Sequence, residues 1–164
     1  MERPFSAIKE SFDRARKFGE VLLSMTVIEA QLEKKRWDLG MSSDFNLCDT
    51  FKMLGGLGGG KFGIDYNNLY SAVTKNLGLA ITEDEVFIMY YKLDIDCDGL
   101  ISYEEMERCF LPRAKEYAHL IETRGGFYKD TKDLKKYFER PTRGALSVFI
   151  NGYVECEVNI ELMR

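Results

Sequence analysis

The stretch Asp94–Glu105 reads D-I-D-C-D-G-L-I-S-Y-E-E, and its spacing decides the fold expected for the chain. Carboxylate side chains stand at the first, third, fifth and twelfth places, and a serine stands at the ninth. A hard divalent cation such as calcium takes about six to eight oxygen ligands, and this is the spacing that supplies them. We therefore predict one Ca²⁺ site, whose ligands come from Asp94, Asp96, Asp98, the carbonyl of Leu100, Ser102 and Glu105.

Two further residues fit a loop of this kind. Gly99 stands at the sixth place, where the chain must turn sharply with a positive φ that a side chain would strain. Ile101, two residues later, is the apolar residue expected to pair with a second loop. The stretch therefore resembles the calcium loop of the EF-hand family, the superfamily of calmodulin-like proteins. That resemblance implies a helix on either side of the loop and bound Ca²⁺, with Mg²⁺ as an alternative ion at rest.

An earlier stretch, Leu57–Asn68, aligns with this loop when Ile64 is matched to Ile101. Its first, third, fifth and twelfth places carry leucine, glycine, lysine and asparagine, and Asp65 at the ninth place is its only acid. We therefore predict a degenerate hand that keeps the helix-loop-helix fold without binding an ion. The glycine-rich run does not match the phosphate-binding pattern GxxxxGK[ST], because Phe62 follows Lys61 where Ser or Thr is required.

Apolar residues recur at helical spacing on both sides of the two loops, which predicts an all-α fold. We assign 1–41 to a long amphipathic helix, 42–112 to paired EF-hands joined by a short β bridge between their loops, and 113–164 to a C-terminal helical extension. Helix caps are expected within 42–44, at Asn67 or Asn68, and at Thr82 with Glu85, and C-terminal helices over 113–124, 131–138 and 142–163. The pattern does not decide whether the first helix packs on its own domain or on a partner.

Composition narrows the class of protein. The chain is 45% hydrophobic, enough for a core, and its 23 basic and 27 acidic residues give no basic excess of the kind that nucleic-acid binding requires. Acidic residues concentrate in 42–112, whereas 113–143 is basic and is a candidate binding surface for an acidic partner. No apolar run is long enough to span a membrane, and four cysteines without CxxC spacing indicate reduced thiols in the cytoplasm.

Two functions remain open on the sequence. The first is a calcium-binding regulatory or adaptor subunit that grips a helix of a larger protein in an apolar groove between the hands, or contacts that protein through its terminal helices. The alternative is a constitutive structural subunit in which calcium stabilises the fold. Phe110–Leu120 weakly resembles a segment of protist ciliary and cytoskeletal EF-hand proteins, which favours a cytoskeletal or ciliary location. No Ser/His/Asp, Cys/His or paired-carboxylate arrangement appears outside the loop, so we do not expect an enzyme.

Overall fold

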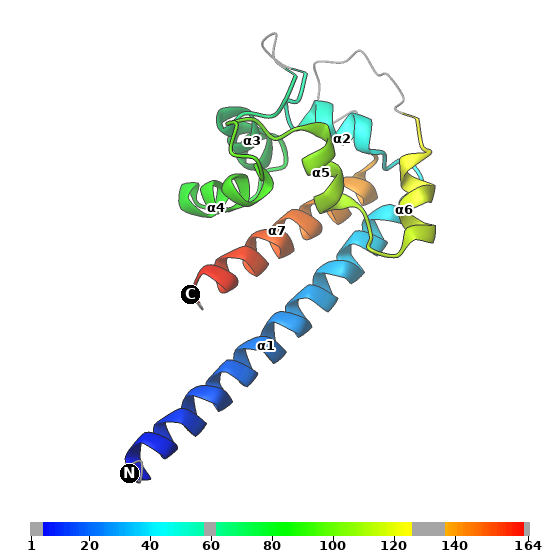
Figure 1. Cartoon of the computed structure of the whole chain (residues 1–164). Coiled ribbons are helices and arrows are strands. Elements are labelled where there is room, and N and C mark those ends of the chain that lie inside the picture. Colours follow the sequence, from blue (N-terminus) through cyan, green and yellow to red (C-terminus); the bar gives the residue numbers. More distant parts are fainter. Residues whose placement is uncertain (1–4, 58–61, 126–136, 163–164) are drawn as a thin grey trace.

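The computed structural model describes residues 5–57, 62–125 and 137–162. All regular structure within these ranges is helical, which confirms the all-α class (Figure 1). The elements are, in chain order, α1 (Phe5–Gly40), α2 (Leu47–Met53), α3 (Tyr66–Ser71), the π-helical turn η1 (Ala72–Asn76), α4 (Glu83–Leu93), α5 (Tyr103–Phe110), α6 (Lys115–Glu122) and α7 (Arg140–Leu162). None of the described helices is long and apolar enough to cross a membrane.

Helix α1 is the longest element, and its two halves differ in environment. Its C-terminal half packs against α7, and Leu32 and Leu39 are buried there. Its N-terminal half projects away from the rest of the chain, with no other described element beside it (Figure 1). The helix predicted from the apolar spacing is therefore present, and packing on its own chain accounts for only half of it.

The sequence predicted some of the N-terminal caps of the helices around the two loops correctly and others not. The capping box of Thr82 and Glu85 is confirmed, with the Glu85 carboxylate accepting the Thr82 N–H at 2.8 Å. Helix α2 begins later than expected, because Asn46 caps it by accepting the Asp49 N–H at 2.7 Å. Helix α3 begins earlier, because Asp65 is its cap.

Asp44 was expected to cap α2 and instead holds the start of α7. Its carboxylate accepts the Glu139 N–H at 2.7 Å and a short hydrogen bond from the Thr142 hydroxyl. The last helix thereby begins at Arg140, two residues before the predicted start. The helix expected over 131–138 lies almost wholly outside the described residues.

One hydrophobic core joins the helices around the loops to α1 and α7. Leu146, Phe149 and Ile150 of α7 are fully buried, and the ring centroids of Phe149 and Phe110 are 4.8 Å apart. Helix α7 crosses beneath α4 and α5 and lies alongside α1 (Figure 1). The core is therefore larger than the range 42–112 assigned to the paired hands.

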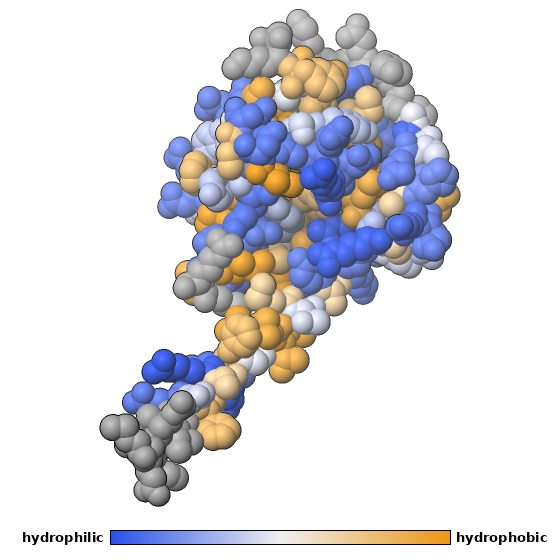
Figure 2. All heavy atoms as spheres, viewed as in Figure 1, coloured by the Kyte–Doolittle hydropathy of each residue, from blue (hydrophilic) through white to orange (hydrophobic). Residues whose placement is uncertain are grey.

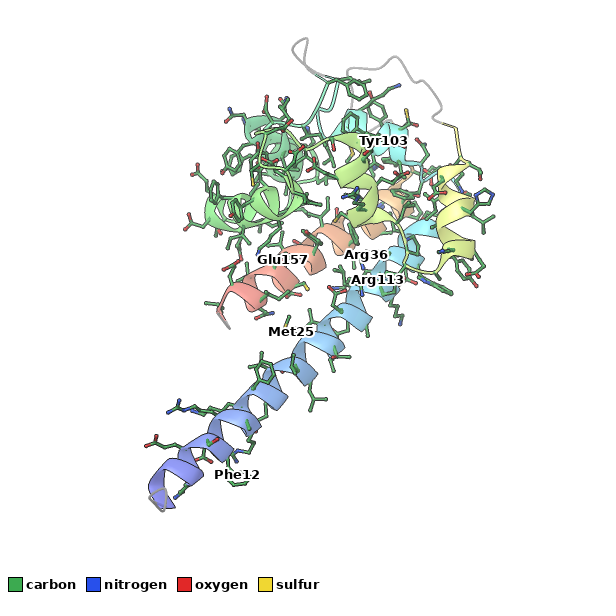
Figure 3. All side chains as sticks on the ribbon, in the orientation of Figure 1. Phe12, Met25, Arg36, Tyr103, Arg113 and Glu157 are labelled. Carbon is green, nitrogen blue, oxygen red and sulfur yellow. The ribbon has the colours of Figure 1, made fainter. Side chains whose placement is uncertain are left out.

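Arg36 fixes α1 to the end of α5. Its Nε donates a 2.8 Å hydrogen bond to the Cys109 carbonyl, and its guanidinium lies 6.0 Å from the centroid of the Phe149 ring (Figure 3). Glu33, one turn earlier, pairs with the same guanidinium at 3.2 Å. A buried charge needs such partners because desolvation without them is costly.

The four cysteines carry free thiols, two of them buried. Burial raises the pKa of the Cys109 thiol to about 12, so this side chain stays protonated at neutral pH. The same cause raises the pKa of Tyr153, its hydrogen-bonded neighbour on α7. Neither group is activated for chemistry.

We expect Phe149→Ala to lower the free energy of unfolding by about 3 to 5 kcal/mol, because it leaves a cavity where α7 meets α5. Val148→Ala is the matched control, since Val148 is 55% exposed on the same helix, and should cost less than about 1 kcal/mol. Urea unfolding measures both changes. Equal effects would show that α7 does not contribute its buried face to the core.

Candidate metal centre

The loop between α4 and α5 gathers three carboxylates. Oxygen atoms of Asp94, Asp96 and Asp98 all lie within 4.8 Å of one another, Asp94 buried and the other two exposed. Three negative charges at this separation repel one another, and a dication between them would turn repulsion into attraction. No other group of three or more potential metal-binding side chains of this kind occurs among the described residues.

Backbone N–H groups hold these carboxylates in place. Asp94 accepts from the N–H of Asp98 at 3.1 Å and from that of Gly99 at 3.0 Å, and Asp98 accepts from the N–H of Leu100 at 2.8 Å. Gly99 has φ +86°, which confirms the positive φ expected at the sixth place. A carboxylate accepts about four hydrogen bonds, so each keeps oxygen lone pairs for an ion.

Glu105, predicted as the ligand at the twelfth place, is bound to the loop backbone. One of its oxygens accepts the N–H of Ile95 at 2.7 Å, and the other accepts both the N–H and the hydroxyl of Ser102 at 2.8 Å. Burial alone would raise the pKa of Glu105, yet the hydrogen bonds from Ser102, Ile95 and Asp96 outweigh it, and the pKa is lowered. The structure thus brings three of the six predicted ligands together and holds Ser102 and Glu105 in a capping box at the start of α5.

One isolated antiparallel β bridge among the described residues links this loop to the earlier one. Ile64 and Ile101 exchange two backbone hydrogen bonds of 2.9 Å in an isolated antiparallel bridge. Both side chains are buried. The bridge fixes the register in which the two loops can be compared residue by residue.

In that register the two loops end in the same way. Asp65 and Ser102 each follow the bridge by one residue and cap the next helix, and Asn68 and Glu105 each stand three residues further on. The Asn68 amide donates to the Asp65 carboxylate at 3.2 Å, and the Asn68 N–H does so at 2.8 Å. Asp65 is thus occupied as a cap, while Gly59 and Lys61, predicted at the third and fifth places, lie outside the described residues.

The apolar residues expected to line a groove between the hands are not available to a partner in this structure. Only Phe87 is exposed, and the others are buried in the common core: Phe51, Met53, Leu54, Leu69, Val73, Met89, Met106 and Phe110. Helix α7 covers the end of this face at Phe110. The sequence showed apolar residues at helical spacing in α7, but it did not indicate which helices those residues would pack against.

A cavity of about 190 Å³ separates the acidic loop from α7. Ile95 and Glu105 line it from the loop, Arg36 lines it from α1, and Tyr153 and Glu157 line it from α7 (Figure 3). Beside it, Lys92 of α4 pairs with Glu161 of α7 at 2.7 Å. Apart from Glu105, the sequence analysis assigned none of these residues to a site, because they come from segments that only the fold brings together.

Comparison with known proteins adds no identification, since the chain matches no protein-family model, no curated protein and no solved structure. Which metal ion the loop suits is therefore judged from the chemistry of its donor atoms. The donor set consists of carboxylate oxygens, which suit Ca²⁺ or Mg²⁺. It contains no imidazole or thiolate group of the kind that selects zinc or copper. Cys97 is exposed in the same loop with φ +58°, and its sulfur lies 3.8 Å from the Asp94 carbonyl oxygen.

We expect Glu105→Gln to weaken calcium binding by at least about tenfold, because an amide cannot offer two charged oxygens to the ion. Asp65→Asn is the matched control, since asparagine caps a helix as well as aspartate does. Isothermal titration calorimetry on both variants provides the comparison. An equal loss of affinity in the two variants would contradict the assignment of the site to the second loop.

Proposed function

We propose that this protein is a calcium-binding regulatory or adaptor subunit of the EF-hand type with one ion site. The observation that carries the proposal is the triad of Asp94, Asp96 and Asp98, held by backbone N–H groups in a loop between two helices. The bridge to the earlier loop supports it, because paired loops of this kind are how EF-hands complete a core.

In the proposed site the three aspartates, the Leu100 carbonyl and Ser102 surround the ion, Ser102 directly or through a water, and Glu105 adds both oxygens. Bound Ca²⁺ would supply the positive charge that offsets the clustered carboxylates. To contribute, Glu105 must give up the hydrogen bonds from Ile95 and Ser102 that now hold it. Mg²⁺, which keeps several waters, would need fewer of these groups at rest.

A change at Glu105 has a physical route to α7. Glu105 lies in the first turn of α5, and the last residue of α5, Phe110, packs on Phe149. The same glutamate faces the cavity that Tyr153 and Glu157 line. We infer that calcium loosens α7 from the apolar face that it covers, which would then receive an amphipathic helix of a larger partner.

The alternative is a constitutive structural subunit, in which the ion only stabilises the fold. The specific observation in its favour is that the apolar face is already covered by the chain's own helix. The weak resemblance of Phe110–Leu120 favours, for either function, a cytoplasmic location at the cytoskeleton or cilium. Neither function requires catalysis by this chain.

Calorimetry combined with hydrogen exchange tests the proposal. We expect one Ca²⁺ per chain and faster amide exchange in α7 when calcium is bound, because opening of α7 exposes its backbone. The Glu105→Gln variant at the same calcium concentration is the control and should exchange as the calcium-free protein does. One bound ion with unchanged exchange in α7 would support the structural subunit, and no binding would refute both.

A further inference from the structure

We infer that the projecting half of α1 is a self-association surface, on which a second copy of this chain binds antiparallel. Ile28 is the first α1 residue that packs against the core among the described side chains. Before it lie Phe12, Phe18 and Leu22, which are 72%, 65% and 47% exposed. Figure 2 shows apolar side chains gathered along this part of the helix.

These side chains form one continuous face. At 100° per residue, Phe12 to Met25 place an apolar stripe on one side of the helix, and every charged residue from 9 to 20 falls on the other side. The stripe contains Phe12, Ala15, Phe18, Gly19, Leu22 and Met25. In proteins most helical stability comes from packing of an apolar face, and this face has no described element packed against it.

The surface shape of the stripe is complementary to a second copy of itself, because large and small residues lie next to one another along it. Its large residues, Phe12 and Phe18, stand on either side of Ala15, and Gly19 follows. A Cβ added at Gly19 would meet nothing within 4 Å, so the partner's backbone and rings have room to approach there. At roughly 200 Å² per phenylalanine, the exposed parts of Phe12 and Phe18 supply on the order of 270 Å² per chain, about a third of a standard interface.

Charge and length select the antiparallel orientation. Residues 9–17 carry four basic and two acidic side chains, whereas 18–27 carry only the acidic Glu20. A parallel pair would set the basic stretches of the two copies alongside each other, whereas an antiparallel pair sets each alongside residues 18–27, whose single charge is Glu20. Antiparallel pairing centred near Phe18 also overlaps the whole free segment and keeps the two cores at opposite ends.

Light scattering after size exclusion, with the full chain in chelator, tests the inference independently of calcium binding. We expect the mass to rise toward twice 18.9 kDa with concentration. Phe18→Glu should raise the dissociation constant at least about tenfold, since it places a carboxylate in the apolar seam. Ser24→Glu, on the opposite face, is the matched control and should leave the dissociation constant unchanged. A monomer at every concentration would overturn the inference, even if the helix binds another protein.

A spin label tests the orientation. With the half-exposed Cys48 and the exposed Cys97 both replaced by serine, a label at Lys9→Cys should give a distance of about 27 Å along the helix axis between the two copies in an antiparallel pair centred at Phe18. A parallel pair would bring the same labels to a clearly shorter distance, because they would then lie at the same height on helices whose axes are about 8 to 10 Å apart. The short distance would overturn the antiparallel assignment.

Discussion

The short helices around the two loops pack on one another but leave the end of their shared apolar face, at Phe110, for α7 to bury, and this burial is the constraint on which the rest of the structure depends. Phe149 against Phe110 is the central contact, and Leu146 and Ile150 extend it along the helix. Two polar anchors keep α7 and α1 in position: Asp44 at the start of α7, and Arg36 between α1 and the end of α5. Fixing a chain of this length costs a large conformational entropy, which only contiguous apolar burial of this kind offsets.

The two loops end in different side-chain hydrogen bonds. Both meet at the Ile64 and Ile101 bridge, and both pass directly into a capped helix. In the first loop the Asp65 carboxylate and the Asn68 amide satisfy each other. In the second loop, a serine and a glutamate hydrogen-bond to each other in the same way, and three further carboxylates lie close together in the turn. The second loop is therefore the one that a bound cation would stabilise most. From the bridge onward, the described parts of the two loops therefore follow the same course and differ in side-chain charge.

Much of this was predictable from residues close together in the sequence. The positive φ of Gly99, the capping box of Thr82 and Glu85, and the long first helix all depend on local preferences that a short window contains. The cap of α2 was misplaced because Asp44 is used by α7, almost a hundred residues away. Long-range contacts such as Arg36 with the Cys109 carbonyl leave no periodic signal. For the site, the sequence predicted six ligands, and only the structure showed that Glu105 is hydrogen-bonded to the loop backbone and lines the cavity next to α7.

A crystal structure of the protein grown with Ca²⁺ tests the central claim most directly. We expect one ion, with oxygens of Asp94, Asp96, Asp98 and Glu105 at about 2.3 to 2.6 Å and with Glu105 turned away from the Ile95 N–H. An empty second loop at millimolar calcium, or an ion held in the loop of residues 57–68, would contradict it.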